Sequence, residues 1–194
     1  VTETDGSFVI KFIAKADNAI PEKDEPIFSY SVTADVTDAN GESRSDEKKL
    51  RIGYTALSAS LDINEWQTKD KAVSIKVQSS THDGEGRPAK GRLKVFRLKE
   101  PAKVVRRDLS THTQGHWSSP RLKNEPVKPD PSSPLSWDTA EVIAERSFNT
   151  DEKGVAQIEI PLPVGIYKAI LDSQDNFGKA ITAQKIFEVL DPNK

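Results

Sequence analysis

The sequence contains no cysteine, and charges of opposite sign nearly cancel. The missing cysteine excludes disulfide bonds, thiol nucleophiles and thiolate metal ligands, although it leaves the cellular compartment open. With 28 basic and 30 acidic residues, the chain lacks the basic excess typical of nucleic-acid-binding proteins, so we expect no nucleic-acid partner. No apolar run approaches the ~20 residues of a membrane-spanning helix, so we expect no membrane contact by this chain.

Methionine is also absent, and no signal peptide is visible. We therefore expect these 194 residues to be an excised or processed piece of a longer protein. At 35% hydrophobic and 30% charged, the chain has enough apolar side chains for modest cores. Its length permits one large domain or two small ones.

Apolar and polar residues alternate along most of the chain, as they do in half-buried β-strands. The longest alternating run is 28–37. Shorter runs lie at 8–12, 57–63, 73–77, 93–95, 142–148, 156–160, 166–171 and 186–190. Asn, Asp and Gly, which favour turns, separate them at 38–41, 82–86 and 151–154. Because no long stretch has a helical period, the pattern predicts an all-β protein of short antiparallel strands, typical of immunoglobulin- or fibronectin-like sandwiches.

Two segments of the chain repeat each other. Tyr30 and Tyr167 are 137 residues apart, and the same offset relates Asp38 and Gly41 to Asp175 and Gly178. The run 47–54 falls on 184–191 without a gap. Upstream, the Thr-Asp-Gly at 4–6 before FVIKF corresponds to Thr150-Asp151 and Gly154 before VAQIEI. A fixed offset with shared turn residues indicates a repeated structural unit.

The repeat predicts two β-sandwich units, of which the first is incomplete. Residues 1–54 match only the later part of a unit and offer three strands, whereas residues 55–194 hold a complete sandwich of about seven strands. Gly53 to Ala56 is a very short link, so we expect the units to hold a nearly fixed relation. Residues 99–137 interrupt the second unit with six of the twelve prolines. Because proline cannot pair within a sheet, we expect an irregular insertion there, open to trypsin near Arg106-Arg107 or at 121–128.

The three histidines offer little for a metal ion. His112 and His116 have the spacing of one helix face, but STHTQGHW contains glycine and no helical pattern, so a solvated loop is favoured. His82 lies in a turn sequence. Asp172, Asp175 and Asn176 resemble an oxygen-rich calcium loop without the glycine and distal glutamate of an EF-hand. Because the matching segment at Asp38 has the sequence of a turn, we favour a turn at Asp175 as well. The alternative is a calcium-binding loop.

No catalytic, cofactor-binding or metal-binding set emerges, so we expect no enzyme activity and no cofactor. A nucleophile elbow and phosphate-binding glycine loops are absent from the sequence. Carboxylate pairs at Asp24-Glu25, Asp46-Glu47 and Asp151-Glu152 are interpreted as solvated loop residues. Finally, Trp66, Trp117 and Trp137 have two readings: an aromatic sugar-binding platform, or, as we favour, packing of the insertion against the sandwich.

Several stretches of the chain form a distinctive set. The first half has AIP at 19–21, PIFSYSVTADVTDANGESR at 26–44 and IGY at 52–54. The second half adds the insertion with Trp117, Pro120 and Trp137, then FNTD at 148–151, GIY at 165–167 and DNFG at 175–178. With these stretches the chain resembles bacterial alpha-2-macroglobulin family proteins, especially those of Bacteroidetes. The resemblance covers essentially the whole chain, and its most specific part is ADVTDANGESRS.

The resemblance implies a non-catalytic structural module. In that family, macroglobulin-like domains form a scaffold. An attacking protease cuts a bait segment, and in many members a thioester then traps that protease. The thioester needs Cys-x-Glu-Gln, so without cysteine no functional residue of the family transfers to a position here. We expect a periplasmic or envelope-anchored endopeptidase inhibitor, whose partners would be the remaining domains and target proteases. The alternative is a carbohydrate-binding or adhesin-type sandwich.

The first unit also predicts a partner for its apolar face. That face would consist of residues that alternate along its three expected strands: Phe8, Ile10, Phe12, Phe28, Tyr30, Val32, Leu50 and Ile52. Burying even half of it is worth several kcal/mol, at about 1.5–3 kcal/mol for each large apolar side chain. We expect this face to be covered in one of two ways: by packing on the second unit or, as we slightly favour, by a two-fold contact between chains.

Overall fold

The computed structural model describes residues 5–103, 105–106 and 130–193. Within these ranges the regular structure is β-strand with two short 3-10 helices, η1 (Glu22–Asp24) and η2 (Pro134–Ser136). The prediction of an all-β sandwich protein is therefore confirmed. In the described part of the chain, no helix is long and apolar enough to cross a membrane.

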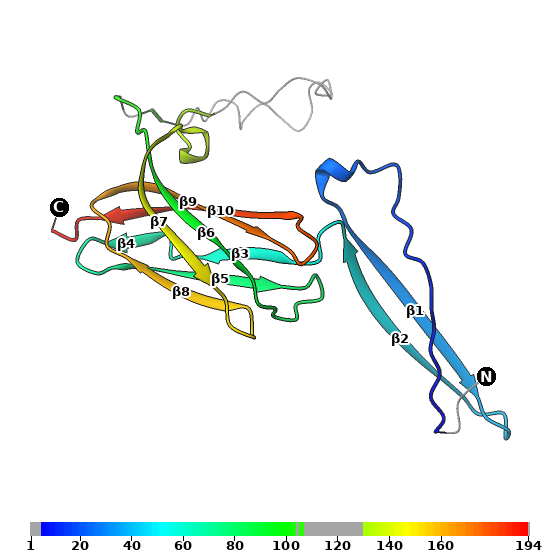
Figure 1. The fold of residues 1–194 in the computed structure, drawn as a ribbon. Coiled ribbons are helices and arrows are strands. Elements are labelled where there is room, and N and C mark those ends of the chain that lie inside the picture. Colours follow the sequence, from blue (N-terminus) through cyan, green and yellow to red (C-terminus); the bar gives the residue numbers. More distant parts are fainter. Residues whose placement is uncertain (1–4, 104, 107–129, 194) are drawn as a thin grey trace.

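The strands form one separate hairpin and one sandwich (Figure 1). The hairpin pairs β1 (Ile27–Thr37) with β2 (Ser43–Gly53). A three-stranded sheet has the order β3-β5-β8, and a five-stranded sheet has the order β4-β10-β9-β6-β7. The strands of the sandwich are β3 (Ser58–Asp62), β4 (Trp66–Thr68), β5 (Val73–Ser80), β6 (Lys90–Leu98), β7 (Thr139–Asn149), β8 (Val155–Ile160), β9 (Gly165–Gln174) and β10 (Ala180–Leu190).

The core of the sandwich lies between its two sheets, where alternate residues of each strand point inward. Along β5, for example, buried residues alternate with more exposed ones, and Val73, Ile75 and Val77 are completely buried. The buried cluster consists of Ile63, Val73, Ile75, Val77, Leu93, Val95, Phe148, Ile160, Leu162, Tyr167, Ala169, Leu171, Phe187 and Val189. Tyr167 and Phe187 stack with ring centroids 5.7 Å apart at the centre.

The predicted repeat appears as two hairpins in the same register. In β1–β2, Tyr30 lies opposite Leu50, and in β9–β10, Tyr167 lies opposite Phe187. Each of these four positions differs from its counterpart by 137 residues, so the offset found in the sequence holds across both strands. The tyrosines also share a role: the Tyr30 hydroxyl donates to Lys15 O and that of Tyr167 to Pro163 O, both at 2.8 Å.

Three turns share one geometry as well: those of the β1–β2 and β9–β10 hairpins and the connection between β7 and β8. In each, an aspartate Oδ1 accepts from the backbone N–H groups two and four residues later, and a glycine three residues later has a positive φ. These aspartates are Asp38, Asp151 and Asp175. The glycines are Gly41, Gly154 and Gly178, with φ of 87°, 73° and 81°. A type I turn followed by a left-handed glycine is a common three-residue hairpin loop, which explains why this sequence pattern recurs.

One predicted strand was wrong. Residues 8–12 are extended but belong to no strand, so residues 5–53 contain two strands and not three. The counterpart of this segment, β8, is a strand because it pairs with β5. No counterpart of β5 exists among the residues described before β1, so residues 8–12 have nothing to pair with. Alternation alone predicted the side-chain pattern and missed the absent partner.

The hairpin projects away from the sandwich, and the N-terminal segment runs alongside it (Figure 1). Packing of the hairpin face on the second unit, one of our two expectations, was therefore wrong. The short link leads the chain directly from β2 into β3, which leaves no length for a reversal. The insertion begins after β6 and ends before β7. Residues 104 and 107–129 of the insertion lie outside the described residues, and they include most of the trypsin sites expected above.

Candidate functional site

One cluster of polar contacts between distant parts of the chain is the joint between hairpin and sandwich, which we define as residues 51–56 with the loops that contact them. Ala56 N donates to Asp175 Oδ2 at 2.8 Å, from the turn between β9 and β10. Arg51 N donates to Asp83 Oδ1 at 3.0 Å, from the loop between β5 and β6. Two sandwich loops thus hold the backbone at both ends of the joint.

His82 also belongs to the joint. Its Nε2 lies 2.7 Å from Thr55 O. Because a carbonyl can only accept, Nε2 is the donor in this hydrogen bond. The other ring nitrogen, Nδ1, is buried and has no hydrogen-bond partner among the described residues. The ring therefore fixes the link and offers no free ligand atom to solvent.

The outer side of the joint is packed by aromatic and charged groups. The Tyr54 ring meets Phe28 edge-on at 6.2 Å between centroids. Lys179 Nζ lies 5.5 Å from the centre of the same ring and 2.8 Å from Glu22 Oε1. Since Lys179 and Glu22 are largely exposed, this ion pair contributes little to stability. Its position shows that residues before β1 also take part in the joint.

Asp175 is the central residue of the joint. It is 6% exposed; Oδ1 accepts from Phe177 N and Lys179 N, both at 2.9 Å, while Oδ2 accepts from Ala56 N. Its pKa is lowered from the usual 3.8, chiefly because the Ala56 N–H donates to the carboxylate, with smaller effects from Lys179 and Phe177. Both oxygens are thus occupied by backbone donors, which accounts for the aspartate without a calcium ion.

Changing Asp175 should loosen the joint. Asp175→Asn keeps one oxygen for the turn but directs an amide N–H₂ at Ala56 N–H, so it should remove the contact to the link. We expect the hairpin to become variable in orientation while the sandwich stays folded, which residual dipolar couplings of the two parts would measure. Asp38→Asn, in the matching turn of the hairpin, is the control and should leave the orientation unchanged. Identical couplings in wild type and Asp175→Asn would contradict the role of Asp175.

The joint should also depend on pH. A carboxylate whose pKa is lowered in the folded state stabilises that state fully above its unfolded pKa, and the contribution is lost as pH falls through the folded pKa. We therefore expect the Ala56 amide resonance to shift in acid with a midpoint below 3.8. Asp175→Asn should abolish the transition. A midpoint at or above 3.8 would show that the Ala56 bond does not favour the charged form.

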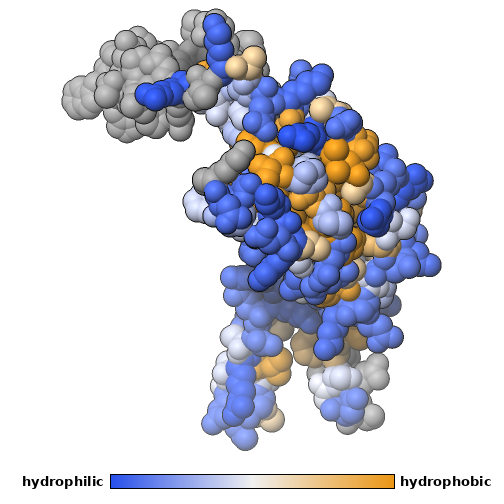
Figure 2. Space-filling view, turned by 90° about the vertical axis from the view of Figure 1, so that its left-hand side faces the viewer, coloured by the Kyte–Doolittle hydropathy of each residue, from blue (hydrophilic) through white to orange (hydrophobic). Residues whose placement is uncertain are grey.

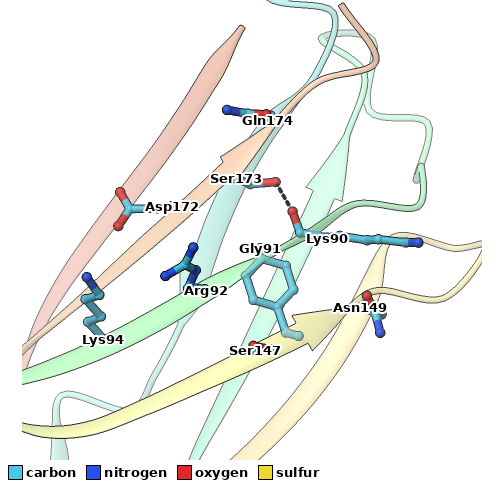
Figure 3. Close-up of a pocket in the computed structure, with 10 residues that line it drawn as sticks. Lys90, Gly91, Arg92, Lys94, Ser147, Asn149, Asp172, Ser173 and Gln174 are labelled. Carbon is cyan, nitrogen blue, oxygen red and sulfur yellow. Dashed lines mark hydrogen bonds between the residues drawn. The ribbon is translucent and has the colours of Figure 1, made fainter. Parts of the chain in front are cut away.

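A second candidate is a shallow depression of about 580 Å³ at one end of the five-stranded sheet (Figure 3). Lys90, Arg92 and Lys94 line it from β6, with Asp172 opposite Arg92 on β9. Arg92 also lies 3.7 Å from Glu145. The hydroxyl of Ser173 donates to Lys90 O at 2.8 Å, the bond dashed in Figure 3, and so is already engaged. We interpret this surface as the charged outer side of a sheet.

The remaining candidates do not converge on one place. Asp24 ends η1, Asp151 caps a turn, and Asp46-Glu47 lies in β2, where we had expected a loop. Trp66 is 75% exposed on β4, while Trp137 Nε1 donates to Pro131 O at 2.9 Å within its own loop. Those of the sequence candidates that lie outside the described residues are Arg107, His112, His116, Trp117 and the expected trypsin sites at 121–128. No group of three or more His, Asp or Glu side chains that could hold a metal occurs in the described ranges.

Fold and joint together define an all-β sandwich protein with an additional, partly open hairpin unit. In comparisons with known proteins, no family model and no curated protein matches this chain.

Proposed function

We propose that this chain is a non-catalytic scaffold segment built from tandem β-sandwich units, and that it belongs to an alpha-2-macroglobulin-like protease inhibitor of the bacterial cell envelope. One observation carries the scaffold role: the β1–β2 hairpin repeats the register of β9–β10 at an offset of 137 residues, and two loops of the sandwich hold the short link that joins this hairpin to it. The assignment to the protease-inhibitor family rests on the sequence resemblance.

The strand order supports an immunoglobulin- or fibronectin-like unit. Three strands form one sheet and the others the second, and β6, β9 and β10 are neighbours through β9. Tyr167 lies near the start of β9, and its hydroxyl bonds back to Pro163 O. This arrangement matches the tyrosine corner of immunoglobulin-like domains. Such domains act as modules that present loops and interfaces at fixed spacing.

A rigid joint is what a scaffold around a large target needs. Contacts between domains of one chain are often small, so motion between domains is the default. Here, Ala56, Thr55 and Arg51 are each bonded to a different side chain of the sandwich. The joint therefore lets the chain transmit the position of one unit to the next.

The test uses the full-length protein that contains this chain, mixed with a broad-specificity endopeptidase. A scaffold that encloses the protease should block cleavage of a large protein such as casein while sparing a short chromogenic peptide. Loss of both activities would indicate an active-site inhibitor instead, and unchanged casein cleavage would contradict the inhibitor assignment. The matched control, Asp175→Asn, should weaken the block without unfolding the sandwich.

The carbohydrate-binding alternative has one specific observation in its favour, the 75% exposure of Trp66. An exposed indole is the kind of surface on which a sugar ring stacks. If polysaccharides quench the tryptophan fluorescence of the chain and Trp66→Ala abolishes the effect, the alternative gains over the scaffold. We expect no quenching.

A further inference from the structure

The apolar face of the β1–β2 hairpin is only partly covered by the described residues. In β9 and β10, Tyr167, Ala169, Leu171 and Val189 are completely buried. Their counterparts at the offset of 137 are Tyr30, Val32, Ala34 and Ile52; the first three are only half-buried, and Ile52 is 37% exposed. The same positions of the same unit thus form a core in one copy and a surface in the other.

The second unit shows what normally covers this face. Along one edge of β9, residues 91–97 of β6 pair antiparallel with residues 167–173. Across the face, β5 and β8 supply buried side chains from the opposite sheet. In the first unit, β1 pairs with β2 and with no other strand among the described residues. Its edge at residues 30–36 is the counterpart of the edge that β6 fills, and no strand of the described ranges pairs with it.

A hydrophobic groove already lies over this face. The segment at 8–12 stands opposite the hairpin, with the Phe12 ring 5.8 Å from that of Tyr30. Between segment and hairpin is a groove of about 410 Å³, lined mainly by Phe8, Ile10, Phe12, Val32, Ala34 and Leu50. In Figure 2, the hairpin end of the molecule appears as two projections with a gap between them. The three residues on the segment side remain 45–50% exposed.

We propose that the edge of β1 beside this groove is a docking site for a β-strand that pairs antiparallel with β1 and points apolar side chains at alternate positions toward the groove, and that the strand belongs to the polypeptide ahead of Val1. Addition of a strand to an exposed edge supplies main-chain hydrogen bonds, while alternate side chains supply specificity. The proposal rests on the repeat and the open groove, and it stands without the protease-inhibitor assignment.

The register of the docked strand follows from the repeat. In the second unit, Leu93 lies opposite Leu171 and Val95 opposite Ala169, so the docked strand should place apolar residues opposite Ala34 and Val32. Arg92 lies opposite Asp172, whose counterpart is Asp35. A basic residue at that position of the strand would therefore meet an acidic one. A shift by one residue would turn the apolar side chains away from the groove, so the register is well specified.

The order of the second unit identifies the source of the strand. There, β5 and β6 precede the turn at Asp151 and are followed by β8 and β9. The first unit begins at the equivalent Asp5-Gly6 turn, where Gly6 has a positive φ of 81°. Strands that precede this turn in the same polypeptide would arrive in the order that the second unit uses.

The first test is a titration of the ¹⁵N-labelled chain with a synthetic peptide of the sequence of Lys90–Leu98, the strand that fills the equivalent edge. Saturable shifts and slowed amide exchange are expected at residues 30–36 of β1. The control peptide carries Leu93→Lys and Val95→Lys and should bind about tenfold more weakly or worse, because it would bury two charges. Ala34→Lys in the chain should weaken binding similarly, with the spectrum of the sandwich unchanged.

The second test identifies the source. The polypeptide extended at its N-terminus by a segment as long as Ser58–Asn149 should protect the free edge of β1 and lose peptide binding, because the site is filled. Peptide saturation without shifts in β1 would overturn the docking site. Protection of the edge in the unextended chain, together with a dimer in sedimentation equilibrium, would assign the groove to a second copy and overturn the proposed source.

Discussion

Tyr167→Ala should destabilise the sandwich by about 3–5 kcal/mol, the usual loss for removing a buried aromatic ring. Tyr167 is completely buried, stacks on Phe187 and donates its hydroxyl to Pro163 O. Burial also raises the pKa of its hydroxyl above 10.0, so the group stays a donor at neutral pH. Urea denaturation followed by near-ultraviolet circular dichroism would measure the loss.

The matched variant is Tyr30→Ala, at the same position of the other copy. We expect it to cost about 1 kcal/mol or less, because truncating a side chain that is still partly in water forfeits little burial. Tyr167→Phe and Tyr30→Phe, which remove only the hydroxyls, serve as further controls and should each have small effects of about 1 kcal/mol. Equal, large losses for both alanine variants would show that the first unit has a covered core, contrary to the open face described here.

Gly154→Ala should have the second-largest effect, roughly 3 kcal/mol or more, because a left-handed backbone and overpacking act together. Gly154 has φ of 73°, and a Cβ at this position would lie 1.9 Å from Ser79 O and 2.9 Å from Arg87 N. Both obstacles are backbone atoms, which cannot rotate away. The turn between β7 and β8 would have to leave β5, to which Gly154 O is bonded through Ser79 N.

Gly178→Ala provides the control for backbone strain alone. Gly178 occupies the equivalent turn with φ of 81°, but no atom of the described part of the chain lies within 4 Å of its would-be Cβ. We expect this variant to cost about 1–2 kcal/mol, the penalty of the left-handed conformation. Thermal unfolding of both variants would compare them. If both variants lose the same stability, the close approach of Gly154 to the Ser79 backbone does not explain the need for glycine at that turn.

The sequence predicted the strands and the repeat because both depend on local patterns. Alternation with a period of two identified the β1 and β9 segments, and shared Asp and Gly at the turns supplied the offset that their register obeys. The same pattern wrongly predicted a strand at 8–12 and did not predict β4, whose three residues pair in parallel with the end of β10. Both errors concern partners, because whether an alternating run becomes a strand depends on a neighbour that may be distant or absent.

The joint could not be predicted for the same reason. The sequence marked Asp175 as a turn residue, which it is, but the second oxygen bonds Ala56, 119 residues away in the chain. His82 stood out only as a histidine in a turn, and nothing local indicated its bond to Thr55. The sequence did carry one signal, the shortness of the link. It predicted a fixed relation between the two units but not the residues that hold them.

Amide hydrogen exchange along β1 and β9 of the free chain tests the central claim, that the two are copies of one strand with different surroundings. β9 pairs on both edges, with β10 and β6, so its central amides should exchange slowly throughout. Among the described residues β1 pairs only with β2, so slow and fast amides should alternate along residues 30–36. Uniform protection of β1, or alternation in β9, would contradict the account.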